Sequence, residues 1–98
     1  MGVPVHQDFR ISIPTQLRSY TGGAAEVSVA VPGPEPRLAD VFAALDAAYP
    51  GIRFRMVDEA GRVRPHVQVF VDRNVERNPD AALRRGAVIM IVGALSGG

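Results

Sequence analysis

The chain has 98 residues, enough for one domain, and 47% of them are hydrophobic, which allows a modest core. A formal net charge of +1 argues against nucleic acid as the main partner, and no apolar run is long enough to span a membrane. The sequence has no cysteine, which excludes disulfides, thiolate metal sites and a cysteine nucleophile. All eleven basic residues are arginine, so no lysine can form a Schiff base or accept a conjugated protein.

The first third of the chain predicts two strands. We expect residues 1–7 to form a loose arm. This segment lacks the apolar core and the basic flank of a signal peptide, so we expect the protein to be cytoplasmic. Strict alternation over residues 9–13 predicts a strand with its three apolar side chains facing inward. Residues 26–31 alternate in the same way, and the turn signal at residues 21–23 allows the two strands to pair in antiparallel fashion.

The middle of the chain predicts one main helix. Five apolar residues recur at helical spacing: Leu38, Val41, Phe42, Leu45 and Tyr49. Pro36 suits the first helical turn, and Pro50 followed by Gly51 ends the helix. Asp40 and Asp46 fall on the polar side, where we expect solvent to cover them.

The second half of the chain predicts further strands. Residues 52–57 leave two interpretations open, because they alternate like a strand but also suit a short second helix. Residues 62–72 predict a strand that is best defined over residues 67–71, and residues 75–77 predict a short edge strand. Residues 87–92 are continuously apolar, which is typical of a central strand.

This order of elements predicts an α+β fold, because a single long helix can cover only one face of a mixed sheet. The β-grasp arrangement fits, with the last strand central and parallel to the first. We therefore expect a single β-grasp domain over residues 1–98, with a sheet of four to five strands on one main helix and a flexible tail at residues 93–98. Eight residues should be buried between sheet and helix: Phe9, Ile11, Val29, Leu38, Phe42, Leu45, Val69 and Ile89.

Alternation in the later strands directs four apolar side chains away from the helix: Phe70, Val88, Met90 and Val92. An apolar stripe on a helix-free sheet face predicts a docking surface for a partner. The alternative is that residues 52–57 cover this stripe. Arg84 and Arg85 lie close in sequence, where they could steer an acidic partner groove or simply occupy a solvated turn.

The sequence ends on Gly97 and Gly98, shortly after the last strand. Glycine has no Cβ, so such a tail can enter a slot that admits only backbone, and the carboxyl carbon of Gly98 is open to attack. Leu95 and Ser96 would line the same slot, with Leu95 as its apolar anchor. The alternatives are a frayed terminus and an idle exposed leucine.

Catalytic and metal-binding groups are sparse in this sequence. His6 and His66 are isolated, and no ligand spacing accompanies them, so we expect no metal site. No nucleophile, base and orienting residue can be assembled from the sequence, so we do not expect an enzyme.

These residues together resemble the ubiquitin-like sulfur carrier proteins. That family includes the molybdopterin synthase small subunit, the thiamine-pathway sulfur carrier, and the carrier that feeds a thiocarboxylate-dependent cysteine synthase. The resemblance covers about residues 9–98, and its most specific part is the diglycine after the last strand. Residues 13–18, the glycine pair at 22–23, and residues 64–71 look most like the cysteine-synthesis carriers.

The resemblance implies a protein-borne cosubstrate, or the non-catalytic small subunit of a synthase. A ubiquitin-activating-like adenylyltransferase would use ATP and Mg²⁺ to join the Gly98 carboxylate to AMP, and a sulfur donor would displace AMP to leave a thiocarboxylate. The carrier itself would bind no cofactor. The implied acceptor is a cysteine synthase, with the molybdopterin synthase large subunit second. A ubiquitin-like modifier or interaction module is the alternative function.

Overall fold

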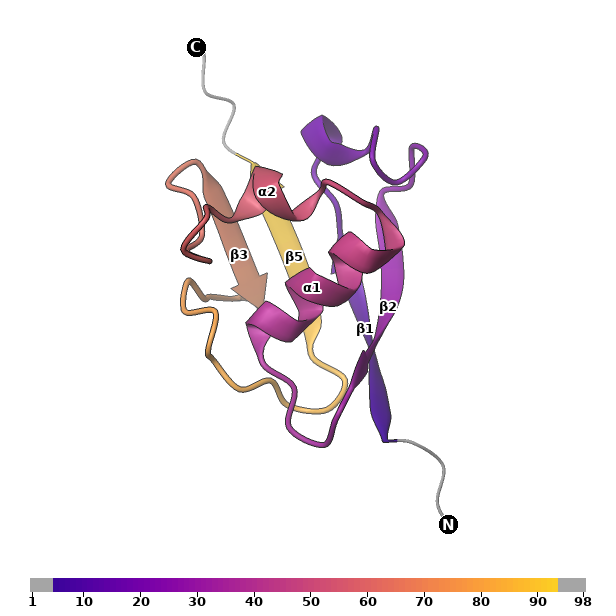
Figure 1. Cartoon of the computed structure of the whole chain (residues 1–98), viewed down its shortest axis with the longest axis vertical. Coiled ribbons are helices and arrows are strands. Elements are labelled where there is room, and N and C mark those ends of the chain that lie inside the picture. The colour runs from indigo at the N-terminus through magenta and orange to yellow at the C-terminus, as the bar shows by residue number, and fades with distance from the viewer. Residues whose placement is uncertain (1–4, 94–98) are drawn as a thin grey trace.

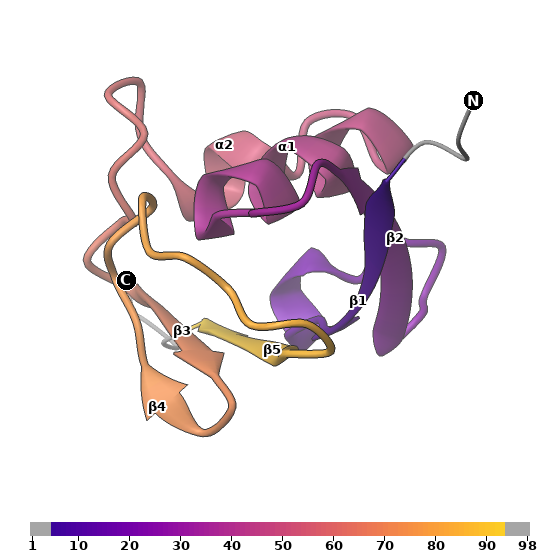
Figure 2. The same ribbon diagram turned by 90° about the horizontal axis from the view of Figure 1, so that it is seen from below.

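The computed structural model describes residues 5–93, which form a curved mixed sheet around one main helix (Figure 1). Figure 2 shows both α-helices on the same side of the sheet. The elements in chain order are β1 (His6–Ser12), the 3₁₀-helix η1 (Thr15–Leu17), β2 (Glu26–Pro32), α1 (Leu38–Ala48), α2 (Arg53–Met56), β3 (Val67–Val71), β4 (Asn74–Val75) and β5 (Val88–Gly93).

The strand order is β2-β1-β5-β3-β4, which confirms the expected β-grasp topology. The final strand β5 lies in the centre, parallel to β1 and antiparallel to β3, while β1 and β2 pair in antiparallel fashion. Its continuous apolar composition fits this central place. The chain therefore leaves the sheet from a central strand and not from an edge strand.

β1 is longer than the alternation alone predicted. It begins at His6, so His6 and Gln7 belong to the strand and not to a loose arm. The partner strand β2 extends to Pro32, which lies opposite His6 and supplies the extra pairing. The Gln7 side chain is buried, and its Nε2 donates a hydrogen bond to the Pro34 carbonyl oxygen at 3.3 Å.

α1 begins at Leu38, two residues later than Pro36, which was expected in the first helical turn. Arg37 is the N-cap, and its backbone N–H donates to Asp40 Oδ2 at 2.8 Å. Pro36 therefore lies before the cap, buried, rather than in the first helical turn. Asp40 is exposed, as expected, and also stabilises the helix start as a capping carboxylate.

The helix connection also depends on a carboxylate. Asp46 Oδ1 accepts hydrogen bonds from the backbone N–H groups of Gly51 at 3.0 Å and Arg53 at 3.1 Å. Asp46 is therefore half-buried and hydrogen-bonded, where a fully solvated side chain was expected. These bonds satisfy N–H groups at the start of α2, so residues 52–57 adopt the short-helix alternative rather than a strand.

α2 packs toward the core side of the sheet. Ile52, Met56 and Val57 are fully buried, whereas Phe54 is 58% exposed. The alternative in which residues 52–57 cover the outer sheet face is therefore wrong.

β3 covers only residues 67–71, the part of the predicted strand 62–72 in which the alternation was clearest. Residues 62–66 run outside the sheet, apart from an isolated bridge between Val57 and Val63. Arg77 holds this loop, because its guanidinium donates to the carbonyl oxygens of Val67 (2.6 Å), Val63 (2.9 Å) and Arg64 (2.9 Å). The edge strand β4 covers Asn74–Val75, so Arg77, expected at its end, lies outside it.

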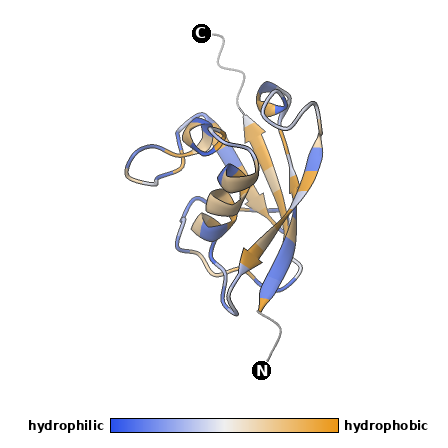
Figure 3. Cartoon of the chain, turned by 45° about the vertical axis from the view of Figure 1, so that its right-hand side comes forward, coloured by the Kyte–Doolittle hydropathy of each residue, from blue (hydrophilic) through white to orange (hydrophobic). Residues whose placement is uncertain are grey.

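The core lies between the sheet and α1, and all eight residues expected there are buried. In Figure 3 the hydrophobic colour follows the strands, whereas the surrounding loops are mostly hydrophilic. No helix within residues 5–93 combines the length and the apolar character needed to cross a membrane.

Candidate functional site

The sheet register gathers apolar side chains on the face opposite the helices. Phe70 on β3 lies directly opposite Met90 on β5, and Phe70 also lies opposite Val75 on β4. Directly opposed residues project from the same face of a sheet. One continuous row therefore crosses three strands, and Ser12 on β1 extends it beside Met90.

We call this surface the apolar patch; its members are Phe70, Val75, Val88, Met90 and Val92. Val75 is 52% exposed, Val88 47% and Met90 43%, and Val92 is also exposed, while Phe70 is half-buried. A shallow pocket of about 340 Å³ opens between Phe70, Val88 and Met90. An exposed apolar surface of this kind is typical of a protein interaction site.

The apolar patch extends the predicted stripe by one residue. Val92 faces outward, as the alternation with Val88 and Met90 predicted. Val75 is added only by the pairing of β4 with Phe70, which no local pattern reveals.

The two candidate steering arginines differ in their contacts. Arg84 donates from Nε to Asp72 Oδ2 at 2.7 Å and from Nη2 to Oδ1 at 3.0 Å. The Val88 backbone N–H also donates to Asp72 Oδ1 at 3.0 Å. Arg84 therefore holds the loop that leads into β5, whereas the exposed Arg85 side chain has no ion-pair partner within residues 5–93.

Asp72 is the acceptor at the centre of this arrangement. The backbone hydrogen bond from Val88 and then the bond from Arg84 lower the pKa of the Asp72 carboxyl below its usual range. Hydrogen bonds to the ionised form favour it, so Asp72 stays charged at neutral pH and remains paired.

Two further arginines border the apolar patch and were missed from sequence. Arg10 lies opposite Val88 across β1 and β5, with its Nε 3.7 Å from Glu26 Oε1. Arg73 lines the shallow pocket and has a backbone φ of 75°, next to Asp72 at 49°. Two consecutive residues with positive φ form the tight β3–β4 turn, a conformation that is uncommon without glycine.

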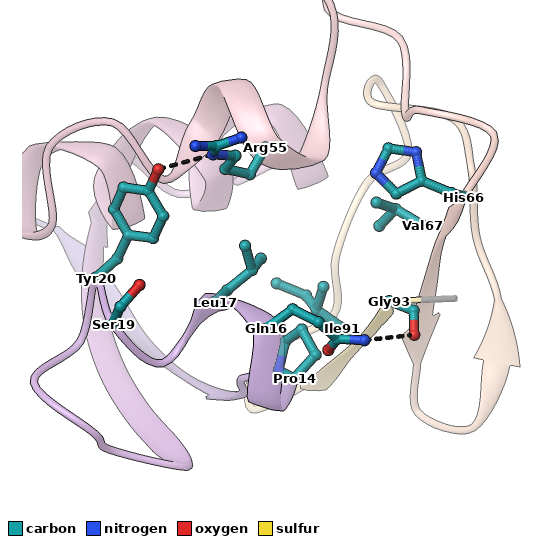
Figure 4. Close-up of a pocket in the computed structure, with 10 residues that line it drawn as sticks. All are labelled: Pro14, Gln16, Leu17, Ser19, Tyr20, Arg55, His66, Val67, Ile91 and Gly93. Carbon is teal, nitrogen blue, oxygen red and sulfur yellow. Dashed lines mark hydrogen bonds between the residues drawn. The ribbon is translucent and has the colours of Figure 1, made fainter. Parts of the chain in front are cut away.

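The chain leaves the sheet at Gly93. Gly93 is the last residue of β5, whereas the sequence predicted a tail that begins at residue 93. Gln16 Nε2 donates to the Gly93 carbonyl oxygen at 3.4 Å (Figure 4), and a Cβ added at Gly93 would lie 3.4 Å from Gln16 Oε1. The predicted reacting residue Gly98 and the predicted slot-binding residues Leu95, Ser96 and Gly97 lie outside the described residues.

A pocket of about 420 Å³ lies beside this exit. Figure 4 shows its lining side chains, which come from η1 and the residues on either side of it, α2, the start of β3 with the loop before it, and the end of β5. Tyr20 and Arg55 face each other across one side, and Arg55 Nε donates to the Tyr20 hydroxyl oxygen at 2.7 Å. Among the described residues 5–93, no acidic side chain lines the pocket.

The two histidines are far apart in the fold. His66 lines the pocket at the tail exit, and His6 lies at the start of β1 with its Nε2 4.0 Å from Asp8 Oδ1. Within residues 5–93, no cluster of three or more His, Cys, Asp or Glu side chains could hold a metal ion.

Comparison with known proteins identifies the family. No protein-family model and no curated protein matches the sequence, but solved structures do. CysO of Mycobacterium tuberculosis is 30% identical, with a TM-score of 0.76 over 89% of this chain and 99% of that one. The chain belongs to the ubiquitin-like sulfur carrier proteins.

Two other structures extend this family likeness. A chain of the BexX/CysO complex of Amycolatopsis orientalis is 25% identical, with a TM-score of 0.78 over 92% of this chain and 99% of that one. SAMP1 of Haloferax volcanii reaches the same TM-score of 0.78 over 93% of this chain and 99% of that one, but at 21% identity it shows a shared fold alone. The CysO matches are to small carrier proteins rather than catalytic enzymes.

Proposed function

We propose that this sulfur carrier is loaded with sulfur at Gly98, as a C-terminal thiocarboxylate, and donates that sulfur to a biosynthetic enzyme. The observation that carries the proposal is the place of the diglycine, which lies within five residues of Gly93 at the end of the central strand β5. The likeness to CysO at 30% identity supports it.

The proposed chemistry takes place in partner enzymes. A Gly98 carboxylate oxygen attacks the α-phosphorus of ATP, pyrophosphate leaves, and Mg²⁺ held by the adenylyltransferase balances the phosphate charge. Hydrosulfide then attacks the carbonyl carbon and AMP leaves, which gives the thiocarboxylate. If the donor is an enzyme persulfide, an acyl disulfide forms instead, and a partner thiol cleaves it to release the thiocarboxylate.

In this proposal the carrier is a cosubstrate, not an enzyme, and binds no cofactor of its own. Its contribution is a tail that fits a narrow slot and a surface that partners recognise. A tethered sulfur atom is presented at high effective concentration and in a fixed direction. Gly97 is needed because a Cβ there would obstruct the slot.

The apolar patch is the proposed docking surface for the activating enzyme. Gly93 follows Met90 by three positions on β5, which is about 10 Å at the usual strand rise. A partner that grips Met90 therefore also fixes where the tail begins. Arg10 and Arg73 border the patch, and Arg85 is exposed in the loop before β5; together they would favour a partner with an acidic rim.

Cysteine synthesis is the favoured pathway, with a cysteine synthase as the sulfur acceptor. The CysO likenesses support this choice, and the solved BexX/CysO complex shows a relative in an assembly with a second protein. The molybdopterin synthase large subunit is the second acceptor. Mixing the loaded carrier with each enzyme and following loss of the C-terminal sulfur would distinguish them.

A protein modifier is the second candidate, because SAMP1, a modifier by name, shares the fold, and a diglycine end serves either role. Intact mass separates the two functions. Exchange of oxygen for sulfur adds about 16 Da, whereas conjugation adds the mass of a whole target. Growth of higher-mass conjugates with no sulfur-bearing form would favour the modifier. Because the chain has no lysine, side-chain-linked polymers of it cannot form.

A further inference from the structure

The pocket beside the tail exit has an apolar floor and a polar rim. Leu17, Val67 and Ile91, all nearly buried, form the floor. Figure 4 shows Tyr20, Arg55 and His66 around it. Such a pocket suits a ligand that is apolar at one point and polar at another.

Arg55 gives the pocket an uncompensated positive charge. Its Nε is bound to the Tyr20 hydroxyl, and its guanidinium carbon lies 5.9 Å from the centroid of the Tyr20 ring, which orients the group. Within residues 5–93, neither Nη atom donates a hydrogen bond and Arg55 forms no ion pair. The bond to Tyr20 raises the pKa of Arg55, so the charge is permanent.

The chain itself supplies a ligand of matching chemistry. Residues 94–98 follow directly on Gly93, which lines the pocket. They contain one large apolar residue, Leu95, and end on Gly98, which carries the free carboxylate in the proposed function. Five residues can reach at most about 17 Å, enough to fold back over a pocket that begins at their own attachment point.

We propose that this pocket receives the chain's own C-terminal segment, residues 94–98, with the Gly98 carboxylate bound by the Arg55 guanidinium. Tethering supports the contact, because a short linker provides an effective concentration in the millimolar range. Exposed ion pairs are weak, so a partner that binds the tail can displace it. The inference shares one premise with the proposed function, that Gly98 is the carboxyl end, but it needs no sulfur chemistry.

Nuclear magnetic resonance of three chains tests this inference. The first ends on the free Gly98 carboxylate, the second on a Gly98 carboxamide, and the third at Gly93. We expect the Arg55 Nε–H signal and the backbone amides of Tyr20 and His66 to shift on amidation and to shift further on truncation. Changes confined to residues next to the altered end, 91–93 on truncation, would overturn the inference.

A matched pair of substitutions identifies the bound group. In Arg55→Gln, amidation should no longer move the Tyr20 and His66 signals. In Arg53→Gln, on the same helix but outside the pocket, it should still move them. Salt near 1 M, where the Debye length is about 3 Å, should shrink the effect in the unaltered chain. An equal response in both variants would overturn the assignment to Arg55. These spectra require no enzyme, so they succeed or fail independently of sulfur loading.

Discussion

Phe70 and Met90 are directly paired across β3 and β5, on the sheet face that neither helix covers. The pair forms the centre of the apolar patch, and Met90 lies on the strand that ends at the tail exit. Substitution of both by aspartate should leave the fold intact, because both side chains project outward, and should weaken activation by the adenylyltransferase.

The measurement is the adenylation rate at limiting carrier concentration, with circular dichroism as the check on folding. Ala43→Asp is the matched control, because Ala43 is exposed on α1, on the opposite side of the sheet from the patch. An unchanged rate in the double variant, or an equal loss in Ala43→Asp, would contradict the docking assignment.

Substitutions of Arg84 and Arg85 should have different effects, one on the stability of the fold and the other on association with the partner. Arg85→Gln should slow association with the activating enzyme, more so at low salt, and leave the unfolding midpoint unchanged, because its side chain has no ion-pair partner within residues 5–93. Arg84→Gln should lower the midpoint, because it breaks two hydrogen bonds to Asp72. Stopped-flow association and urea unfolding would check the pair. Identical behaviour of the two variants would contradict the distinction.

Truncation of Phe42 to alanine should destabilise the fold more than truncation of Phe54. It is 1% exposed on α1, so Phe42→Ala should reduce the free energy of unfolding by about 3–5 kcal/mol. Phe54, 58% exposed on α2, is the control, and Phe54→Ala should change it by about 0.5 kcal/mol or less. Urea denaturation measures both, and comparable losses would show that the core is wrongly assigned.

Asp72 should make stability depend on pH. Because its folded-state pKa is depressed, its contribution is present above the unfolded pKa, about 3.9 for aspartate, and is lost as pH falls through the folded value. Asp72→Asn should therefore lower the urea midpoint at pH 7, with a smaller difference near pH 2. Asparagine also tolerates the positive φ of 49° at this position, so backbone strain should not contribute.

Asp80→Asn is the control for the pH experiment, since the Asp80 side chain makes no hydrogen bond or ion pair within residues 5–93. It should leave the midpoint unchanged at both pH values. A difference between Asp72→Asn and the unaltered chain that is constant with pH would contradict the assigned ionisation.

Local patterns predicted much of this fold because the main elements have strong periodicity. The α1 stripe and the alternation of β1, β2 and β5 each bury one face, so a wrong register would expose Phe9 or Phe42. Continuous apolar character also placed β5 in the centre. The outward positions of Val88 and Met90 followed from the same period of two.

Contacts between distant residues were not predictable in this way. The Arg77 guanidinium holds the loop before β3 through backbone carbonyl groups, to which no sequence pattern points. Asp46 decided between helix and strand for residues 52–57 through hydrogen bonds across the connection. Likewise, Val75 joined the apolar patch through strand pairing alone.

The most direct test of the central claim is the mass of the C-terminal tryptic peptide after incubation with ATP, Mg²⁺, the adenylyltransferase and a sulfur donor. Arg85 is the last arginine, so trypsin releases residues 86–98 with Gly98 attached. Oxidation of Met90 adds nearly the same mass as sulfur, so fragment ions or a Met90→Leu chain must place the change beyond residue 93. A thiol-alkylating reagent adds a second signature, because the chain has no cysteine to compete.

We predict an ATP-dependent gain of about 16 Da on the terminal residue, which becomes alkylatable. The gain should be absent from a chain that lacks Gly98 and from Gly97→Val, whose branched side chain would not fit the slot. Both variants should unfold at the same urea concentration as the unaltered chain. Normal sulfur loading of the chain without Gly98 would contradict the account.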